Sequence, residues 1–338
     1  MPRKVCLEPP LRLLSHGRLR TAAYFHRTFT VATSLETPVN SHAAPAVTST
    51  LVYSSLGNSH LDYSRGWAWQ HLLLSRRLSL RRLKQEHDDP DVVLLLEHAP
   101  VYTLGRGADE NNLTFCNDGR YAGVRERLAR SCRGIGSARL SIDNDRVLSE
   151  AQMHALSDVE AIDRLSSIAT PVIAPNGAKI YRVERGGEVT FHGPGQLVVY
   201  PLIDLQRVPF KSDLHWYLRE IEEVIILTLA DYGIEGKRDE ENTGVWVGDE
   251  KIAAVGVSAS RWITTHGFAL NVCPDLSFFD TSFILPCGIE GKGVTSVQKI
   301  LKQRGADAPS VPEVAMVVLE KLQEVFRIEH IRTGITVQ

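Results

Sequence analysis

The chain has 338 residues, 43% of them hydrophobic and 23% charged, and its formal net charge is −2. This is the composition of a folded globular protein, and the length allows one large domain or two smaller ones. The near-neutral charge gives no general attraction to nucleic acid or to an anionic membrane surface, and no apolar run approaches the roughly 20 residues of a membrane-spanning helix. We therefore expect a protein that binds neither nucleic acid nor membrane.

Residues 1–50 differ in composition from the rest. They carry six Arg or Lys residues against Glu8 and Glu36, many Ser, Thr and Ala residues, and no long apolar run. This is typical of an organelle transit peptide, whereas a secretory signal needs a continuous apolar segment. A disordered basic tail is the alternative. We predict a disordered mitochondrial transit peptide, a matrix location, a mature protein that begins near residues 45–55, and a single domain over residues 51–338.

Beyond residue 50, stretches with helical spacing alternate with short apolar stretches. Residues 63–86 predict an amphipathic helix with Trp67 and Leu72 on its apolar face and arginines opposite. The short apolar runs, rich in β-branched residues, predict strands. In chain order we expect strands over residues 51–56, 92–96, 180–184, 197–203, 244–257 (a hairpin turning at Gly248 and Asp249) and 268–272, and further helices over residues 214–232 and 311–327.

Residues 127–175 are polar and mixed in charge and lack a sustained period, although a surface helix over residues 149–165 is compatible with their pattern. We predict a surface insertion, because the entropy of a loop grows slowly with its length. The irregular order of strands and helices, with at least one hairpin, predicts an α/β (α+β) domain built on a mixed sheet flanked by helices.

Residues 185–196 read Arg-Gly-Gly-Glu-Val-Thr-Phe-His-Gly-Pro-Gly-Gln and join two predicted strands. Glycines let a backbone approach a ligand closely and leave N–H donors unshielded. The stretch lacks the GxGxxG and GK[ST] patterns of dinucleotide and P-loop sites. It is either a binding loop or an irregular turn in which His192 bonds to backbone, and its pattern alone favours neither.

Five cysteines, Cys6, Cys116, Cys132, Cys273 and Cys287, are scattered without a CxxC pair, which excludes a zinc knuckle and suits a reducing compartment. Cys287 lies between a proline and a glycine, where a turn exposes the thiol. Cys273 follows an apolar strand, as a structural cysteine does. Cys116 and Cys132 lie in loop-like segments, and we predict that they are not catalytic.

A thiol with a pKa near 8.5 is only a few per cent thiolate at pH 7, so Cys287 needs a nearby cation to become a nucleophile. Lys251 opens the apolar run Ile-Ala-Ala-Val-Gly-Val, and Lys292 is close to Cys287 in sequence. Lys251 is either a hairpin-edge lysine in water, as most lysines are, or an ammonium at the mouth of an apolar tunnel. The residues alone leave both possibilities open.

Five segments resemble the octanoyl-[acyl-carrier-protein]–protein transferase family of the mitochondrial type, also called lipoate-protein ligase B or lipoyl(octanoyl) transferase. They are residues 185–196, 242–247 (Asn-Thr-Gly-Val-Trp-Val), 251–256 (Lys-Ile-Ala-Ala-Val-Gly), 266–272 (His-Gly-Phe-Ala-Leu-Asn-Val) and 285–289 (Leu-Pro-Cys-Gly-Ile). The resemblance covers roughly residues 90–125 and 175–325. Each segment alone is a weak signal, but five in the family's order and spacing are specific.

The resemblance implies a fold like the biotin/lipoate protein ligase catalytic domain. It implies transfer of an octanoyl group from acyl carrier protein to a lysine of lipoyl domains, the first step of protein lipoylation. The expected acceptors are the lipoyl domains of 2-oxoacid dehydrogenase complexes and the glycine cleavage H protein, and no metal or organic cofactor is expected. By the same resemblance, Cys287 takes the acyl group as a thioester and Lys251 lowers the pKa of that thiol.

The acyl-binding residues are likewise implied by the resemblance. They are Arg185, Gly186, Gly187, Glu188, Val189, Thr190, Phe191, His192, Ala254, Val255, Gly256, Gly267, Phe268 and Ala269. The residue chemistry agrees, since the methylenes of an eight-carbon chain, at about 0.8 kcal/mol each, contribute on the order of 5 kcal/mol when buried in an apolar tunnel. The small residues Ala253, Ala254, Gly256 and Ala269 are expected to leave room for it.

Three other functions remain open. An ATP-dependent lipoate or biotin ligase of the same fold activates a free acid and does not need a nucleophilic cysteine. A non-catalytic protein that docks on lipoyl domains needs neither the thiol nor the lysine. A cysteine hydrolase that pairs Cys287 with His192 would release free octanoate, although no third orienting residue is evident near either. Docking of an acidic carrier protein on the arginines near residues 76–82 is a further hypothesis, against the simpler interpretation of a solvated helix face.

Overall fold

The computed structural model describes residues 50–55, 60–83, 90–121, 123–128, 158–167, 171–285 and 292–333. They lie in one compact unit of the chain, Val47–Gln338. Residues 1–49, on which the transit-peptide prediction rests, and Cys287 fall outside the described residues. None of the helices within the described ranges is long and apolar enough to cross a bilayer.

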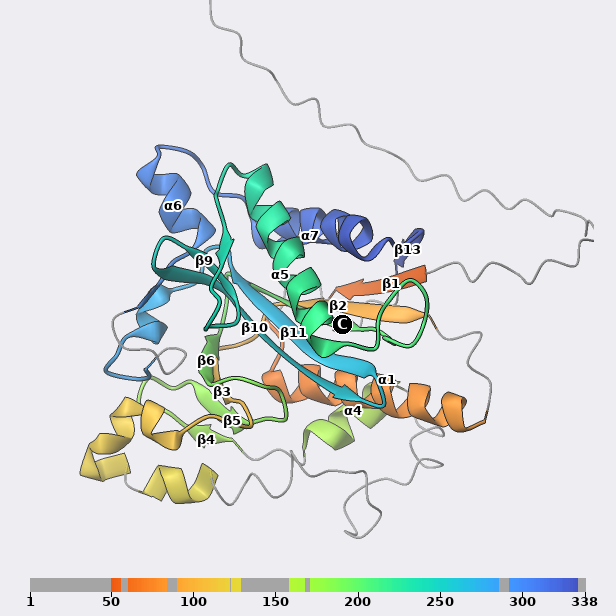
Figure 1. Ribbon diagram of the computed structural model, residues 1–338. Helices are drawn as coiled ribbons and strands as arrows, with labels where there is room; N and C mark the ends of the chain where they lie inside the picture. Colours follow the sequence, from red (N-terminus) through yellow and green to blue (C-terminus); the bar gives the residue numbers. More distant parts are fainter. Residues whose placement is uncertain are drawn as a thin grey trace, which may run out of the picture. The chain divides into compact units, whose positions relative to one another are not determined.

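The centre of the fold is a mixed, nine-stranded sheet (Figure 1). The strands at one end of the sheet pair in parallel, and the strands through its middle pair in antiparallel fashion. The pairing order is β13 (His330–Thr333), β1 (Thr50–Ser55), β2 (Asp91–Leu96), β7 (Gln196–Leu202), β11 (Ile263–Asn271), β10 (Glu250–Ser260), β9 (Val245–Val247) and β8 (Lys237–Arg238), with β12 (Gly293–Val294) beside β10.

A second, smaller sheet contains four strands (Figure 1). Three of them were missed from the sequence. Pro100 and Gly105 suggested a loop around residues 101–104, the glycine-rich stretch suggested a turn at residues 189–192, and residues 172–173 lie in the predicted insertion. The strands at 101–104 and 189–192 are nonetheless buried and pair with each other over four residues. The order is β4 (Val172–Ile173), β5 (Lys179–Arg182), β3 (Val101–Leu104) and β6 (Val189–His192).

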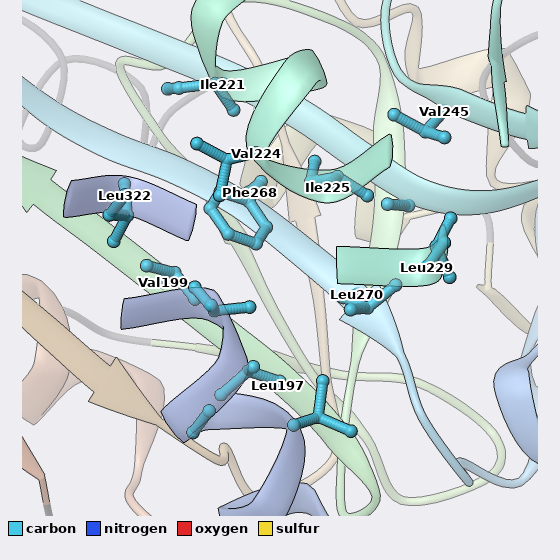
Figure 2. Packing of buried hydrophobic residues seen from close by; sticks show 14 of the residues in the cluster. Leu197, Val199, Ile221, Val224, Ile225, Leu229, Val245, Phe268, Leu270 and Leu322 are labelled. Carbon is cyan, nitrogen blue, oxygen red and sulfur yellow. The ribbon is translucent and has the colours of Figure 1, made fainter. Parts of the chain in front are cut away.

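One face of the large sheet is covered by α5 (Leu214–Asp231) and α7 (Val311–Phe326). Figure 2 shows Ile221, Val224 and Ile225 of α5 over Phe268 and the other large apolar side chains of the sheet. α7 begins at a capping box, in which Ser310 and Glu313 exchange side-chain and backbone hydrogen bonds. The short helix α6 (Val297–Gln303) packs in the same core.

The opposite face is covered by α1 (Tyr63–Arg82) and α4 (Asp158–Ser166), with Leu94, Leu96, Val198 and Tyr200 facing them from the sheet. Successive residues of a strand point to opposite faces, which is why Val93 and Val199 lie in the first core and their neighbours in the second. A third core lies beneath the smaller sheet, beside η2 (Glu110–Asn112), η3 (Thr114–Asn117), η4 (Gly119–Tyr121) and η5 (Leu276–Phe279).

The prediction of a mixed sheet flanked by helices is confirmed, and every predicted strand and helix has a counterpart. The interpretation of α1 is wrong in one respect. Arg77, placed on a solvated face, is 4% exposed and pairs with the buried Asp91 at 2.7 Å. Arg81 donates to Asp204, and Arg76 lies 2.5 Å from Asp158. Arg77 and Arg81 pair with buried carboxylates and Arg76 pairs with a partly exposed one, so these three arginines do not form the free basic patch that carrier docking would need.

The predicted insertion also contains more order than a surface loop. Within residues 127–175, α4 buries Ala161, Ile162 and Leu165 against α1, and β4 pairs with β5. The apolar positions of α4 are three and four residues apart, which is the spacing of one helical face. Residues 129–157 lie outside the described ranges.

Candidate active site

A cavity of about 230 Å³ lies between the large sheet and the segment that leads into β6. β10 and β11 form one wall, and residues 185–192 form the other. The first turn of α1 and the strand β7 contribute Tyr63 and Tyr200, and the turn before β9 contributes residues 241–243. The cavity therefore draws on six separate parts of the chain.

Most of the predicted acyl-binding residues meet in this cavity. Gly186 and Phe191 do not line it: the N–H of Gly186 donates to the Val257 carbonyl at 3.0 Å, and the Phe191 ring stacks on Phe278 in the third core at 4.5 Å between centroids. The predicted residues that do line it are Arg185, Gly187, Glu188, Val189, Thr190, His192, Ala254, Val255, Gly256, Gly267, Phe268 and Ala269.

The floor of the cavity is made of small residues because of the register between β10 and β11. Ala254 pairs with Ala269 and Gly256 pairs with Gly267, and directly paired residues point to the same face. The prediction that Ala253 leaves room for the ligand is wrong, because it points to the other face and packs in the first core. Val255 and Phe268 also pack their side chains in that core, so their backbone is what faces the cavity.

The two glycines of this floor are required by close packing. A Cβ on Gly267 would collide with the Val199 carbonyl, and a Cβ on Gly256 would lie 3.0 Å from the Gly186 carbonyl and 3.2 Å from Cδ of Arg185. Glycine at these positions lets β7 approach β11 and lets the segment at residues 185–187 cross β10. The width of the cavity depends on both contacts.

Arg185 braces the upper wall. Its guanidinium donates to the carbonyl and hydroxyl of Thr103, each at 2.8 Å, and to the carbonyls of Gly186 and Glu188 at 2.8 and 3.0 Å. These bonds tie the glycine-rich stretch to β3. Because Arg185 is only 8% exposed, these hydrogen bonds are buried. They fix the position of residues 185–188 relative to β3 of the smaller sheet.

Lys251 is buried at one end of the cavity, with 7% of its surface exposed, which excludes the hairpin-edge alternative. Its Nζ donates to the Thr243 carbonyl at 3.0 Å and lies 4.7 Å from the centre of the Trp246 ring. Glu241 and Thr243 beside it are exposed, so this end is the mouth. Within the part of the chain that the structure describes, the ammonium has no carboxylate partner.

Lys292, the other predicted cation, is engaged elsewhere. Its Nζ donates to Asp239 at 2.6 Å and lies 4.5 Å from the Trp246 ring. The pair lowers the pKa of the Asp239 carboxyl, chiefly through that hydrogen bond. Lys292 therefore packs on the Trp246 ring and pairs with Asp239, whereas the ammonium of Lys251 faces the cavity.

The predicted nucleophile Cys287 lies outside the described residues, but the chain on both sides of it is described. The Leu285 N–H donates to the Asn112 carbonyl at 2.8 Å. After Lys292, β12 pairs with β10 so that Val294 is opposite Lys251, and the Thr295 N–H donates to the Lys251 carbonyl at 3.0 Å. The described chain resumes beside the lysine.

His192 is held as a neutral imidazole. Its Nδ1 lies 2.7 Å from Oε1 of Gln196, and its Nε2 lies 3.3 Å from the Thr103 hydroxyl. The Gln196 amide donates to the Phe191 carbonyl and to Asn271, which orients Oε1 as the acceptor for Nδ1–H. Burial lowers the pKa of His192 well below its ordinary value. Both ring nitrogens are in use, which argues against its service as the base of a cysteine hydrolase.

Aromatic residues close the inner end of the cavity. The Tyr63 ring lies parallel to His192, with centroids 6.2 Å apart, and packs on His98 at 5.2 Å. The Tyr200 hydroxyl lies 3.0 Å from Nε2 of His98, whose Nδ1 faces the Leu61 carbonyl at 3.1 Å. Burial lowers the pKa of His98 to about 4, so the imidazole is neutral at neutral pH and its Nε2 accepts a hydrogen bond from the Tyr200 hydroxyl.

A buried carboxylate supports the same end from behind. One oxygen of Glu184 faces Nε2 of His71 at 2.6 Å and Nε2 of His266 at 2.9 Å, and the other accepts from the Trp67 indole at 3.1 Å. The His266 N–H donates to Gln70 at 2.6 Å. Burial raises the pKa of Glu184, but the two imidazoles outweigh it and lower the pKa well below its ordinary value.

Sequence reasoning missed Tyr63, Tyr200 and the group around Glu184 as site residues. His266 has a left-handed backbone, with φ of 58°, and directly precedes the predicted Gly267. Its place within a segment that resembles the family was the only signal for His266 in the sequence.

Burial raises the pKa of the Cys116 and Cys273 thiols, as expected of non-nucleophilic cysteines. No group of His, Cys, Asp or Glu among the described residues is arranged to hold a metal ion.

Comparison with known proteins decides the family. Residues 163–323 match the lipoyl protein ligase A/B catalytic domain. Octanoyltransferase from Synechococcus elongatus is 41% identical over 70% of this chain and 73% of its own length. Octanoyltransferase from Flavobacterium psychrophilum is 37% identical over 79% of this chain and 93% of its own length. The chain belongs to the octanoyltransferase family.

Two solved structures share the fold. Lipoate-protein ligase A bound with ATP superposes with a TM-score of 0.51 at 13% identity and covers 86% of this chain and 90% of its own. A lipoate protein ligase from T. acidophilum with bound lipoic acid gives 0.50 at 13% identity, over 85% and 90%. At this identity they show the fold alone, and they confirm the expectation of a biotin/lipoate ligase-like domain.

As a member of the octanoyltransferase family, the chain is an acyltransferase in protein lipoylation. The described site has two features that acyl transfer to and from a thiol requires. A cavity with a floor of small residues can hold an acyl chain, and a buried ammonium at its mouth can stabilise a thiolate.

Proposed function

We propose that Cys287 carries the octanoyl group as a thioester and that Lys251 activates the thiol. The acyl chain occupies the cavity between β10–β11 and residues 185–192. The buried Lys251 ammonium carries the proposal. Burying an ammonium without an anionic partner is costly, and a thiolate would supply the missing charge. The described chain that follows Cys287 pairs with β10 beside Lys251, which supports this placement of the charge.

The reaction divides into two exchanges. The Cys287 thiolate attacks the thioester carbonyl of the donor, the bond to the donor sulfur breaks, and the released thiolate takes up a proton. The amine of the acceptor lysine, once it has lost its proton, attacks the second thioester. The Cys287 sulfur then leaves as a thiolate stabilised by Lys251. The first exchange is nearly isoenergetic and the second is downhill, so ATP is not needed.

The donor in this proposal is an octanoyl acyl carrier protein, and the acceptors are lipoyl domains, including those of 2-oxoacid dehydrogenase complexes and the glycine cleavage H protein. We further propose that the protein works in the mitochondrial matrix after removal of a transit peptide. The relatives named above are bacterial, so this location rests on the basic, Ser- and Thr-rich composition of residues 1–50 alone.

The test uses the isosteric variant Lys251→Met beside Cys287→Ala, with Lys299→Met as a matched control because Lys299 pairs with Glu250 at the surface. Intact-mass spectrometry after mixing with octanoyl acyl carrier protein measures the acyl adduct. We expect a hydroxylamine-sensitive adduct in the wild type and the control and none in Cys287→Ala. In Lys251→Met the adduct should form about thirtyfold more slowly at pH 7, because a thiol of pKa near 8.5 is only about 3% ionised there.

Raising the pH to 9 should restore most of the rate in Lys251→Met, since the thiol then ionises unaided. Equal rates in Lys251→Met and the wild type at pH 7 would remove the lysine from the mechanism. A dependence on ATP would identify a ligase, and release of free octanoate without an acceptor would identify a hydrolase. A wild type that binds lipoyl domains but forms no adduct would be a docking protein.

A further inference from the structure

The cavity changes from exposed to buried along its length. Glu241 and Thr243 at the mouth are exposed, whereas Tyr63 and Tyr200 are each 3% exposed and belong to the core beneath α1. A chain that enters beside Lys251 therefore ends against these two tyrosines.

The length of the path agrees with this direction. Gly256 lies five residues beyond Lys251 on β10, which at about 3.3 Å per residue is on the order of 16 Å. The seven carbon–carbon bonds of an octanoyl chain, at about 1.5 Å each, give a contour of about 11 Å. An octanoyl chain that starts beside Lys251 therefore covers about two thirds of the floor between Lys251 and Gly256, which pairs with Gly267.

Tyr63 is anchored from outside the cavity. It begins α1, where Asp62 caps the helix by accepting from the Ser64 N–H at 3.0 Å, and Lys179 of the small sheet pairs with Asp62. Its ring packs between His98 and Tyr181. His98 and Tyr181 do not line the cavity, so these contacts hold the buried ring from outside it, and the ring forms an end wall.

We propose that Tyr63 sets the length of the acyl chain that the enzyme accepts, by closing the inner end of the cavity at eight carbons. This inference rests on the proposed function, because it takes the cavity to be the acyl site. A chain with two further methylenes would have to displace the ring or leave those methylenes outside. A smaller residue at this position removes the wall and lets the longer chain be buried.

The experiment compares Tyr63→Ala and Tyr63→Leu with Leu72→Ala. Leu72 is fully buried in the same core on the same helix and does not line the cavity, so its variant controls for a general loosening of the core. The full chain is given hexanoyl, octanoyl, decanoyl and dodecanoyl carrier proteins. Transfer to a lipoyl domain gives kcat/KM for each length, and intact mass identifies the acyl group on the enzyme.

For Tyr63→Ala we expect the ratio of decanoyl to octanoyl kcat/KM to rise at least tenfold, which corresponds to about 1.4 kcal/mol and is within what burial of two methylenes supplies. Tyr63→Leu should shift the ratio in the same direction by less, and it carries the test if the alanine variant does not fold. Leu72→Ala should keep the chain-length preference of the wild type.

A decanoyl to octanoyl ratio that stays within twofold of the wild type in the Tyr63 variants, or that rises equally in Leu72→Ala, would overturn the proposal. Failure of the wild type to form any octanoyl adduct would instead overturn the proposed function, so the two failures are distinct. Tyr63→Trp provides the opposite perturbation: a larger ring should lower the octanoyl rate relative to the hexanoyl rate.

Discussion

Replacing Glu184 by glutamine tests whether the buried carboxylate behind the cavity holds the site together. One carboxylate oxygen faces the Nε2 atoms of His71 and His266, and the other accepts from the Trp67 indole. Glutamine has the same shape, and its oxygen can serve the two histidines. Its NH₂ group must then face the indole N–H, which places one donor against another inside the core.

The expected loss follows from this arrangement. A buried donor left without an acceptor costs about 1–3 kcal/mol, and loss of the negative charge beside two imidazoles adds to that. Urea unfolding at pH 7 should therefore give Glu184→Gln a free energy of unfolding that is lower than that of the wild type by about 1–3 kcal/mol or more. Because Glu184 directly precedes Arg185 and His266 precedes Gly267, the rise in KM for octanoyl carrier protein should exceed any fall in kcat.

A double-mutant cycle with Trp67→Phe isolates the clash. Phenylalanine removes the indole N–H, so Trp67→Phe with Glu184→Gln should lose less stability than the sum of the two single variants. The pKa of Glu184 is depressed in the folded state, so its contribution is complete above the ordinary value of 4.5 and is lost as pH falls through the folded pKa. The gap between the wild type and Glu184→Gln should thus narrow below pH 4.5. Additive losses, or a gap that widens with acid, would refute this account.

Two further substitutions test the packing. Arg77→Leu leaves the buried Asp91 without its cationic partner and should cost about 3–5 kcal/mol, whereas Arg76→Leu, whose pair with Asp158 is partly exposed, should cost less than about 1 kcal/mol. Equal urea midpoints for these two variants would contradict the burial assigned to Arg77. Gly267→Ala places a methyl group against the carbonyl of the next strand and should cost about 1–3 kcal/mol, while Gly107→Ala, with open space around its Cβ, should leave the thermal midpoint unchanged.

The sequence predicted the strands that carry the floor of the site, because their signals are local. Val255 and Phe268 are large and apolar and alternate with small residues, and the Gly248–Asp249 turn joins β9 to β10. That alternation identified β10, but it could not say which face of the strand is the core. Ala253 and Ala254 look alike in sequence, and only the bulge between Lys251 and Ala253 and the pairing with β11 show which of the two faces the core.

The inner end of the cavity could not be predicted, because its contacts join residues that are far apart in the chain. Trp67 and Glu184 are separated by 117 residues, and Glu184 and His266 by 82. Arg77 illustrates the same limit: charge placed it on a solvated face, and its burial depends on Asp91 and on the Leu202 carbonyl, which come from other elements. Helical periodicity reports the average environment of a face and does not report a buried partner.

The two ends of the cavity are supported by different parts of the fold, and this separates the two properties assigned to them. The mouth depends on Lys251, which contacts the Thr243 carbonyl and the Trp246 ring. Lys292, paired with Asp239, packs on the same ring. The inner end depends on the first turn of α1 and on the Glu184 carboxylate with its hydrogen-bond partners. Because no hydrogen bond among the described residues joins the two groups, we expect a change at the mouth to alter the ionisation of the thiol and a change at the inner end to alter the choice of acyl chain. An enzyme of this architecture can therefore change the length of chain that it accepts and keep its thiol chemistry.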